Sequence, residues 1–216
     1  GNLIEEADSF LNGALGGDFL EHKAANFAVN REGYFHYSIR AFKFGYDGVP
    51  SNYGGLGQKP GYTFLVTQGC PGDHDVRTYM HELGHNLGLG HGGFESCNYK
   101  PNYNSIMNYK YSGGAFRDCG LEITGDLIFS VGEKADLDET ALNESAGICE
   151  EVAMDWNSDG DYGVVQVDIN SSEPSQSANC GGTYTVLRDH NDWENILYLG
   201  PMSPNGIFLA EEVSCQ

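Results

Sequence analysis

The chain has 216 residues, which fits one large domain or two small ones and is enough for a proper hydrophobic core. It carries 31 acidic against 11 basic residues, and the resulting net charge of −20 disfavours nucleic acid and anionic membrane surfaces as partners. The sequence contains no stretch of about 18 consecutive apolar residues, so it predicts no transmembrane helix. The acidity itself fits a secreted protein kept soluble, a salty environment or calcium binding.

The first third of the chain predicts one helix and two strands. Residues 3–28 have apolar positions at helical spacing, interrupted at Gly16-Gly17, and predict an amphipathic helix. Aromatic and β-branched residues predict strands over 34–44 and 62–68, separated by a glycine-rich loop over 45–60. The helix would back the sheet that these strands form.

A second helix is expected to follow this sheet. Asp73 or Asp75 would cap its start, and it would run to about Leu87. The segment HELGHNLGLGH, residues 81–91, begins in the last part of this helix and continues beyond its end. This segment holds the residues with the clearest chemistry in the chain.

The histidines of this segment have the spacing of metal ligands. His81 and His85 are four residues apart, so on a helix both side chains project from the same face and can bind one Zn²⁺. Glu82 stands beside the first ligand, where its carboxylate can reach a water on the metal rather than the metal itself. Gly88 can adopt a positive φ and end the helix, which would return His91 as the third ligand. Three protein ligands and one open position are typical of a catalytic zinc site. The alternative is a helix whose histidines are ordinary core or surface residues.

The pattern H-E-x-x-H-x-x-G-x-x-H over residues 81–91 resembles that of the metzincin clan of zinc-dependent endopeptidases. A second motif, Ser105-Ile106-Met107-Asn108-Tyr109, is similar to the S-x-M-x-Y Met-turn of several metzincin families. The resemblance implies that Met107 forms an apolar floor under the three imidazoles. It also implies that Tyr109 lies close to the zinc and stabilises the reacting oxyanion. Gly92, directly after the third histidine, matches neither the Glu of astacins, the Pro of serralysins nor the Asp of adamalysins, so no individual family is assigned.

The resemblance implies an α+β fold in which a twisted mixed sheet, a backing helix and the active-site helix lie above a cleft. An irregular lower subdomain with a C-terminal helix would lie below the cleft. Residues 1–216 would form a single catalytic domain, with an upper subdomain over about 1–91 and a lower one over about 92–216. In the clan, the last strand before the active-site helix is the sheet edge that pairs with extended substrate. We expect this edge at 62–68, with the substrate-binding residues Tyr62, Thr63, Phe64, Leu65 and Val66.

The segment 155–161 (DWNSDGD) is similar to the D-x-N-x-D-G core of calcium loops. Its oxygen-bearing side chains at alternate positions suit a hard cation, and the candidate calcium ligands are Asp155, Asn157, Asp159 and Asp161. The twelfth position holds Gln166 instead of Glu, so the alternative is a turn rich in Asp and Asn that precedes a strand over 163–169. Residues 189–199 predict a final helix.

Six widely spaced cysteines predict up to three disulfides and therefore an oxidising, extracellular or periplasmic compartment. Six free thiols are the alternative. Fifteen pairings are open, and a bridge between Cys97 and Cys119, which flank the Met-turn, is one hypothesis. Asn143 and Asn170 each begin an N-glycosylation motif.

Together these features predict a secreted zinc metalloendopeptidase that holds one catalytic Zn²⁺ and, in the acidic loop, a structural Ca²⁺. Glu82 would act first as general base towards the zinc-bound water and then as acid towards the leaving amine. We expect a monomer that acts on protein or peptide substrates, without nucleic acid or membrane partners. Two alternatives are a non-catalytic zincin-like binding or adhesion module, which the intact Glu82 disfavours, and a calcium-dependent binding domain with incidental histidines.

Overall fold

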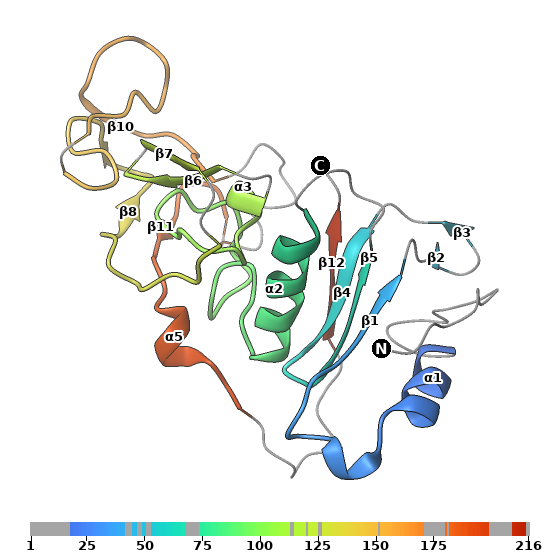
Figure 1. Cartoon of the computed structure of the whole chain (residues 1–216). Coiled ribbons are helices and arrows are strands. Elements are labelled where there is room, and N and C mark those ends of the chain that lie inside the picture. The colour runs from blue at the N-terminus through green and yellow to red at the C-terminus, as the bar shows by residue number, and fades with distance from the viewer. Residues whose placement is uncertain are drawn as a thin grey trace. The chain divides into compact units, whose positions relative to one another are not determined.

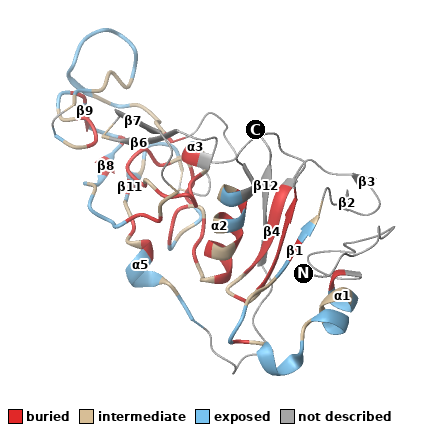
Figure 2. Ribbon diagram, in the orientation of Figure 1, coloured by how far each residue is buried: buried red, intermediate tan, exposed pale blue. Residues whose placement is uncertain are grey.

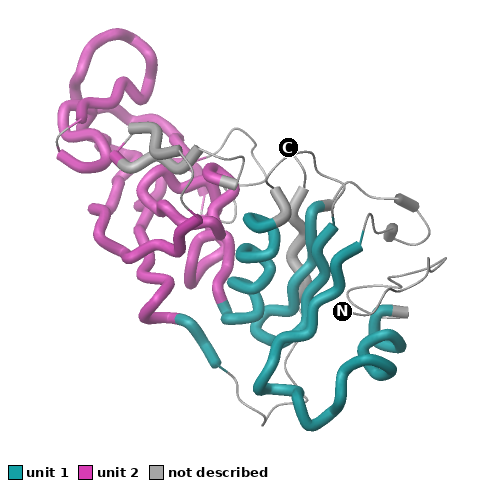
Figure 3. Tube along the Cα trace, in the orientation of Figure 1, with its two compact units in different colours: residues 1–88, 196–216 teal, residues 89–195 magenta. Residues whose placement is uncertain are grey.

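The structure is a computed structural model of the whole chain. It describes residues 18–41, 45–46, 49–50, 53–67, 74–112, 115–119, 121–124, 127–150, 152–170, 180, 182–198 and 209–214. These residues form a mixed α+β protein, which confirms the predicted fold class at that level. The chain divides into two compact units, residues 1–88 with 196–216 and residues 89–195 (Figure 3). Within the described ranges, no helix combines the length and hydropathy needed to cross a membrane.

The first unit contains a four-stranded mixed sheet with the order β1-β5-β4-β12 (Figure 1). Strand β5 runs parallel to β1 and antiparallel to β4, and β12 runs antiparallel to β4. Strands β1 and β5 lie within the predicted ranges 34–44 and 62–68, although residues 34–36 form a turn before β1. The loop expected over 45–60 is wrong in its second half, because strand β4 forms there and pairs with β5 despite its three glycines. The strands of this unit are β1 (Tyr37–Ala41), β2 (Gly45–Tyr46), β3 (Val49–Pro50), β4 (Tyr53–Lys59), β5 (Thr63–Thr67) and β12 (Leu209–Ser214).

Strand β5 lies in the middle of this sheet, so the expectation that 62–68 forms its edge is wrong. Phe64, Leu65 and Val66 each have a partner residue on both neighbouring strands. All five residues of β5 are buried, which is typical of a consecutive run of apolar and β-branched residues covered on both faces. The substrate-binding role expected for Tyr62, Thr63, Phe64, Leu65 and Val66 depended on the edge position and therefore loses its basis.

Two helices of the first unit pack on this sheet. Helix α1 (Asp18–Asn26) precedes the short 3-10 helix η1 (Val29–Arg31), and Phe19 and Phe27 place their rings 5.8 and 5.3 Å from the ring of Tyr37 on β1. Helix α2 (His74–Asn86) lies along β4 and β5 (Figure 1). The side-chain amide of its last residue, Asn86, donates to the carbonyls of Gln58 and Thr63 at 2.8 and 2.9 Å. These bonds fix the end of α2 to β4 and β5, where the buried residues of this unit gather (Figure 2).

The predicted starts of the helices over 3–28 and 73–87 lie at least in part outside the described residues. Residues 3–17 of the helix expected over 3–28 lie outside the described residues, and of the remainder Asp18–Asn26 forms α1. Asp73 also lies outside them, whereas Asp75 lies within α2 and is therefore not its N-cap.

The second unit has little regular secondary structure in the residues described. Its strands pair two by two, β6 with β7, β8 with β11 and β9 with β10. A cluster of buried apolar residues, Cys97, Leu137, Leu142, Ile148 and Leu187, forms its core. The elements of this unit are α3 (Tyr109–Ser112), β6 (Ala115–Asp118), β7 (Leu121–Thr124), β8 (Leu137–Asp138), β9 (Leu142–Asn143), β10 (Val164–Val165), β11 (Val186–Leu187) and α5 (Asp192–Asn195).

Predictions for the C-terminal part need correction. Of the helix expected over 189–199, the described residues 189–198 form only the single turn α5, and residues 196–198 have no regular structure. The side chain of Asp192, at the start of this turn, is fully buried and accepts hydrogen bonds from the hydroxyls of Tyr103 and Ser105. The strand expected over 163–169 is reduced to Val164–Val165. Strand β12 pairs with β4, so the chain returns to the first unit and the range 92–216 is not one subdomain.

Two disulfides, Cys97–Cys180 and Cys119–Cys149, lie in the second unit. The hypothesis of a Cys97–Cys119 bridge is therefore wrong, since Cys97 pairs across a sequence separation of 83 residues. Cys70 and Cys215 lie outside the described residues.

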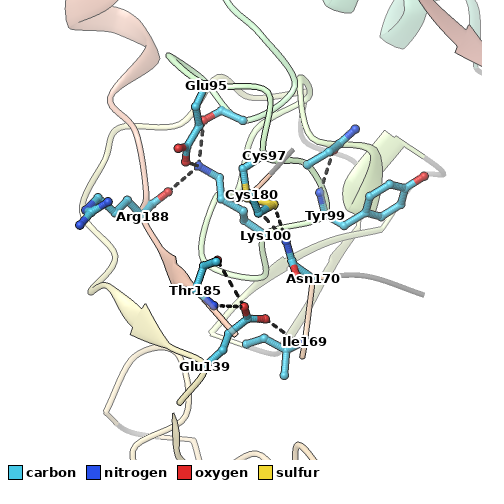
Figure 4. The surroundings of a disulfide bond; sticks show 12 residues. Glu95, Cys97, Tyr99, Lys100, Glu139, Ile169, Asn170, Cys180, Thr185 and Arg188 are labelled. Carbon is cyan, nitrogen blue, oxygen red and sulfur yellow. Dashed lines mark hydrogen bonds and ion pairs between the residues drawn. A yellow bond between two sulfur atoms is a disulfide. The ribbon is translucent and has the colours of Figure 1, made fainter. Parts of the chain in front are cut away.

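Asn170 is buried, and its amide Nδ2 lies 2.7 Å from the Cys180 sulfur (Figure 4), so the second glycosylation motif has no accessible acceptor.

Candidate metal centre

The last two turns of α2 carry the first two histidines of the motif. His81 is 2% exposed and His85 is fully buried, and their ring centroids lie 4.6 Å apart with the planes at 85°. This proximity is what a four-residue spacing on one helix produces. Both imidazoles are therefore held on one face of a helix that is itself fixed to the sheet.

The chain turns sharply after α2. Gly88 has a φ of +91°, and its N–H donates to the carbonyl of His85, so the glycine ends the helix as the sequence predicted. Gly90 and Gly93 exchange backbone hydrogen bonds of 2.7 and 3.0 Å, which places His91 in a tight turn. One potential ligand atom from each of His81, His85 and His91 lies within 4.8 Å of the other two. This cluster of three imidazoles could hold a metal ion, and it offers the nitrogen donors that zinc and other divalent transition metals accept.

Gly92 is a glycine because nothing larger fits its position. A Cβ atom at Gly92 would collide with the carbonyl oxygen of Cys97 and lie 2.9 Å from that of Glu95. The carbonyl of Gly92 accepts a hydrogen bond of 2.8 Å from the buried ammonium of Lys100. The Lys100 side chain, eight residues further along the chain, thus fixes the backbone at Gly92.

Lys100 is fully buried and makes two further bonds. Its Nζ donates to Oε1 of Glu95 at 2.9 Å and to the carbonyl of Arg188 at 2.6 Å (Figure 4). Burial lowers the pKa of Lys100, and the bond to Glu95 opposes that change. Lys100 thereby connects the turn that carries His91 to the chain near residue 188, and the sequence pattern gave no sign of this.

Hydrogen bonds made by Ser105 and Asn108 stabilise the Met-turn, residues 105–109. The hydroxyl of Ser105 accepts from the N–H of Met107 at 3.2 Å, and the amide of Asn108 donates to the carbonyls of Lys100 and Tyr103, both at 2.7 Å. Met107 is fully buried. The polar residues of the motif therefore shape the turn, while the role of Met107 under the imidazoles stays a prediction.

Tyr109 lies beside the third histidine. Its ring centroid is 4.0 Å from that of His91, with the planes at 44°. Its backbone N–H donates to Oδ1 of Asn98 at 3.0 Å, which fixes the start of α3. The structure thus brings together His91 and the tyrosine that the resemblance implies.

Asp192 organises the Met-turn, and sequence reasoning missed it. Its fully buried carboxylate accepts hydrogen bonds from the hydroxyls of Tyr103 and Ser105, at 2.8 and 2.6 Å, and from the N–H of Ser130 at 2.8 Å. Burial raises the pKa of Asp192, although these hydrogen bonds act in the opposite direction. His190 lies next to it, with Nε2 3.9 Å from Oδ1 of Asp192. The available signal was an acidic residue at the start of a predicted helix, which is ordinarily only a cap.

The acidic loop gathers a different set of carboxylates from the predicted one. Oxygen atoms of Glu144, Asp155 and Asp159 lie within 4.8 Å of one another. Asp155 accepts from the N–H groups of Asp159 and Gly160 at 3.1 and 2.9 Å, so the loop closes on its own side chains. Glu144 is fully buried and accepts from the N–H of Trp156 at 2.8 Å. A carboxylate from outside the loop thus joins the cluster, whereas the calcium pattern expects one at the twelfth loop position.

Asn157 and Asp161, the other two predicted ligands, lie beside this cluster. Asn157 donates through Nδ2 to Oδ2 of Asp159 at 2.8 Å, and the N–H of Asp161 donates to Oδ1 of the same residue, also at 2.8 Å. These hydrogen bonds lower the pKa of Asp159.

Comparison of the chain with protein-family models, with curated proteins and with solved structures gave no match. An assignment of function therefore depends on the residues and the geometry described above.

Proposed function

We propose that the chain is a zinc-dependent endopeptidase of the metzincin type. The observation that carries this proposal is the cluster of His81, His85 and His91, with Glu82 buried on the same helix directly after the first histidine. Tyr109 beside His91 adds a hydroxyl-bearing side chain at the third ligand. A structural role alone would not require three converging imidazoles and a buried carboxylate in one stretch of eleven residues.

The donor set fits zinc, because three imidazoles leave a position open for water or substrate. When bound, zinc would polarise a peptide carbonyl and lower the pKa of water towards neutrality. Glu82 takes the proton of the attacking water and delivers it to the leaving amine. The hydroxyl of Tyr109 donates a hydrogen bond to the oxygen that becomes negatively charged as the carbonyl is attacked.

Further parts of the proposal concern location, substrate and a second metal. The two disulfides in the described residues support secretion into an oxidising compartment. Proteins or peptides are the proposed substrates, and the sheet with its helix α2 is proposed to correspond to the upper part of a metzincin fold. The carboxylates of Glu144, Asp155 and Asp159 are the proposed site for a structural calcium ion.

The test is cleavage of casein by the purified chain, with zinc measured on the same sample. We expect one zinc per chain, loss of turnover on chelation and recovery when zinc is added back. Glu82→Ala should keep the zinc and lose about 10²–10⁴-fold in turnover, because it removes the proton acceptor and none of the imidazoles. Tyr109→Phe should also keep the zinc and lose about 10²–10³-fold.

The matched control is Glu133→Ala, which removes an exposed carboxylate far along the chain from the motif. It should leave both zinc content and turnover at parental values. A chain with one zinc and no turnover would refute the peptidase and favour a zincin-like binding module. A chain without zinc would refute the metal centre.

A further inference from the structure

Strand β4 presents two glycines to the active-site helix. Gly55 and Gly57 are two residues apart, so they face the same side of the strand. Both are buried, and β5 holds them in register through Gly55 opposite Val66 and Gly57 opposite Phe64. Helix α2 packs against this strand along its length.

The side chain of Glu82 fills the space that these glycines leave. A Cβ atom at Gly55 would lie 2.5 Å from Oε1, 2.7 Å from Cγ and 2.8 Å from Cδ of Glu82. A Cβ atom at Gly57 would lie 2.8 Å from the other carboxylate oxygen, Oε2. All four distances are below 3.0 Å, which real Cβ contacts essentially never show. The carboxylate therefore lies against bare backbone, and only glycine at both positions leaves room for it.

The two glycines differ in what else they approach. The three atoms nearest to a Cβ at Gly55 all belong to the flexible side chain of Glu82. Gly57 also lies close to the helix itself, because its Cβ would be 2.9 Å from the carbonyl oxygen of Glu82 and 3.2 Å from Cβ of His85. One glycine thus limits the position of a carboxylate, and the other limits the distance between strand and helix.

We propose that Gly55 and Gly57 are positioning residues for the metal centre. Gly55 fixes the place of the Glu82 carboxylate, and Gly57 fixes the place of the helix backbone that carries His85. The inference rests on the proposed function for its catalytic consequence. Its geometric part, the coupling of each glycine to Glu82, can be tested without any activity.

The two alanine substitutions should therefore have different effects. In Gly55→Ala the nearest atoms to be displaced, from Cγ to the carboxylate, belong to the side chain of Glu82 and not to the helix backbone, so the fold and the zinc should be retained. Turnover should fall by about 10²-fold with little change in KM, since a displacement of about 1 Å is enough for such a loss. Gly57→Ala forces the helix to shift, so it should weaken zinc binding by about tenfold or more in addition to lowering turnover.

The control is Gly163→Ala, because Gly163 has no atom within 4 Å of its Cβ position and does not have a left-handed φ. It should match the parent in zinc affinity, kcat and KM. The three variants and the parent are compared by zinc titration against a competing chelator and by casein or peptide turnover. Parental kcat in Gly55→Ala, or parental zinc affinity in Gly57→Ala, would overturn the corresponding assignment.

A double-mutant cycle separates this inference from the proposed function. Gly→Ala in a strand normally raises the thermal midpoint, because it removes conformational freedom from the unfolded chain. In the parent, the collision with Glu82 should cancel that rise. In a Glu82→Ala background the collision partner is gone, so Gly55→Ala should then raise the midpoint. The same change in midpoint in both backgrounds would overturn the inference, and a chain that shows the coupling but no peptidase activity would refute only the proposed function.

Discussion

Removal of the Asp192 carboxylate should destabilise the chain strongly. The Asp192→Ala variant leaves two buried hydroxyls, those of Tyr103 and Ser105, and the N–H of Ser130 without their acceptor. Hydrogen bonds to a charged group are worth about 1.5–3 kcal/mol each, and the two hydroxyls can partly recover by rotation. We therefore expect a loss of about 3–5 kcal/mol, close to the cost of breaking a buried ionic contact.

Thermal unfolding followed by circular dichroism measures this loss. At about 2–4 °C per kcal/mol for a chain of this size, the midpoint should fall by about 6–20 °C. Asp192→Asn keeps one acceptor oxygen and avoids the desolvation that raises the pKa of the carboxyl, so its loss should be less than half as large. Glu194→Ala, an exposed carboxylate of the same helix, is the matched control and should stay within about 0.5 kcal/mol of the parent. A midpoint for Asp192→Ala equal to that of the control would refute the role of this carboxylate as the shared acceptor.

Two further predictions concern pH and calcium. Burial lowers the pKa of His190 below its usual value of 6.5, so as the pH falls through about 6.5 the unfolded chain binds a proton that the folded chain does not. The free energy of unfolding should accordingly decrease below about pH 6.5, and His190→Gln should flatten this dependence in urea titrations; an unchanged slope would contradict it. Asp155→Asn should lower the free energy of unfolding by about 1–2 kcal/mol, because both carboxylate oxygens accept backbone N–H groups. Millimolar Ca²⁺ should raise the midpoint of the parent more than that of this variant, and equal responses would exclude the acidic loop as the site.

The parts of the candidate centre that the sequence predicted are those fixed by short-range geometry. A spacing of four residues on a helix places His81 and His85 together whatever the rest of the fold does. Gly88 takes the positive φ that ends the helix, and His91 follows within one turn. Eleven consecutive residues therefore carry enough information to assemble three imidazoles.

The parts that the sequence could not predict depend on contacts between distant residues. The place of β5 in the sheet is decided by its pairing with β1 and β4, and β12 joins the sheet from the far end of the chain. A local pattern gives the faces of a strand but not its neighbours. Two further contacts also join residues more than eighty positions apart, so no local pattern predicts them. They are the disulfide between Cys97 and Cys180 and the hydrogen bond between Ser105 and Asp192.

In the second unit, some of the acidic residues have a structural role as buried hydrogen-bond acceptors. Its described strands are short, so many backbone N–H groups cannot bond within a sheet and need other acceptors. Three fully buried carboxylates serve them: Glu139 accepts from Ile169 and Thr185, Glu144 from Trp156, and Asp192 from Ser130. A carboxylate can accept several such bonds at once, so each one replaces part of a missing strand. Solubility, a salty environment and calcium binding therefore do not explain every acidic residue. Glu139, Glu144 and Asp192 are buried and stabilise the loops by accepting hydrogen bonds from backbone N–H groups.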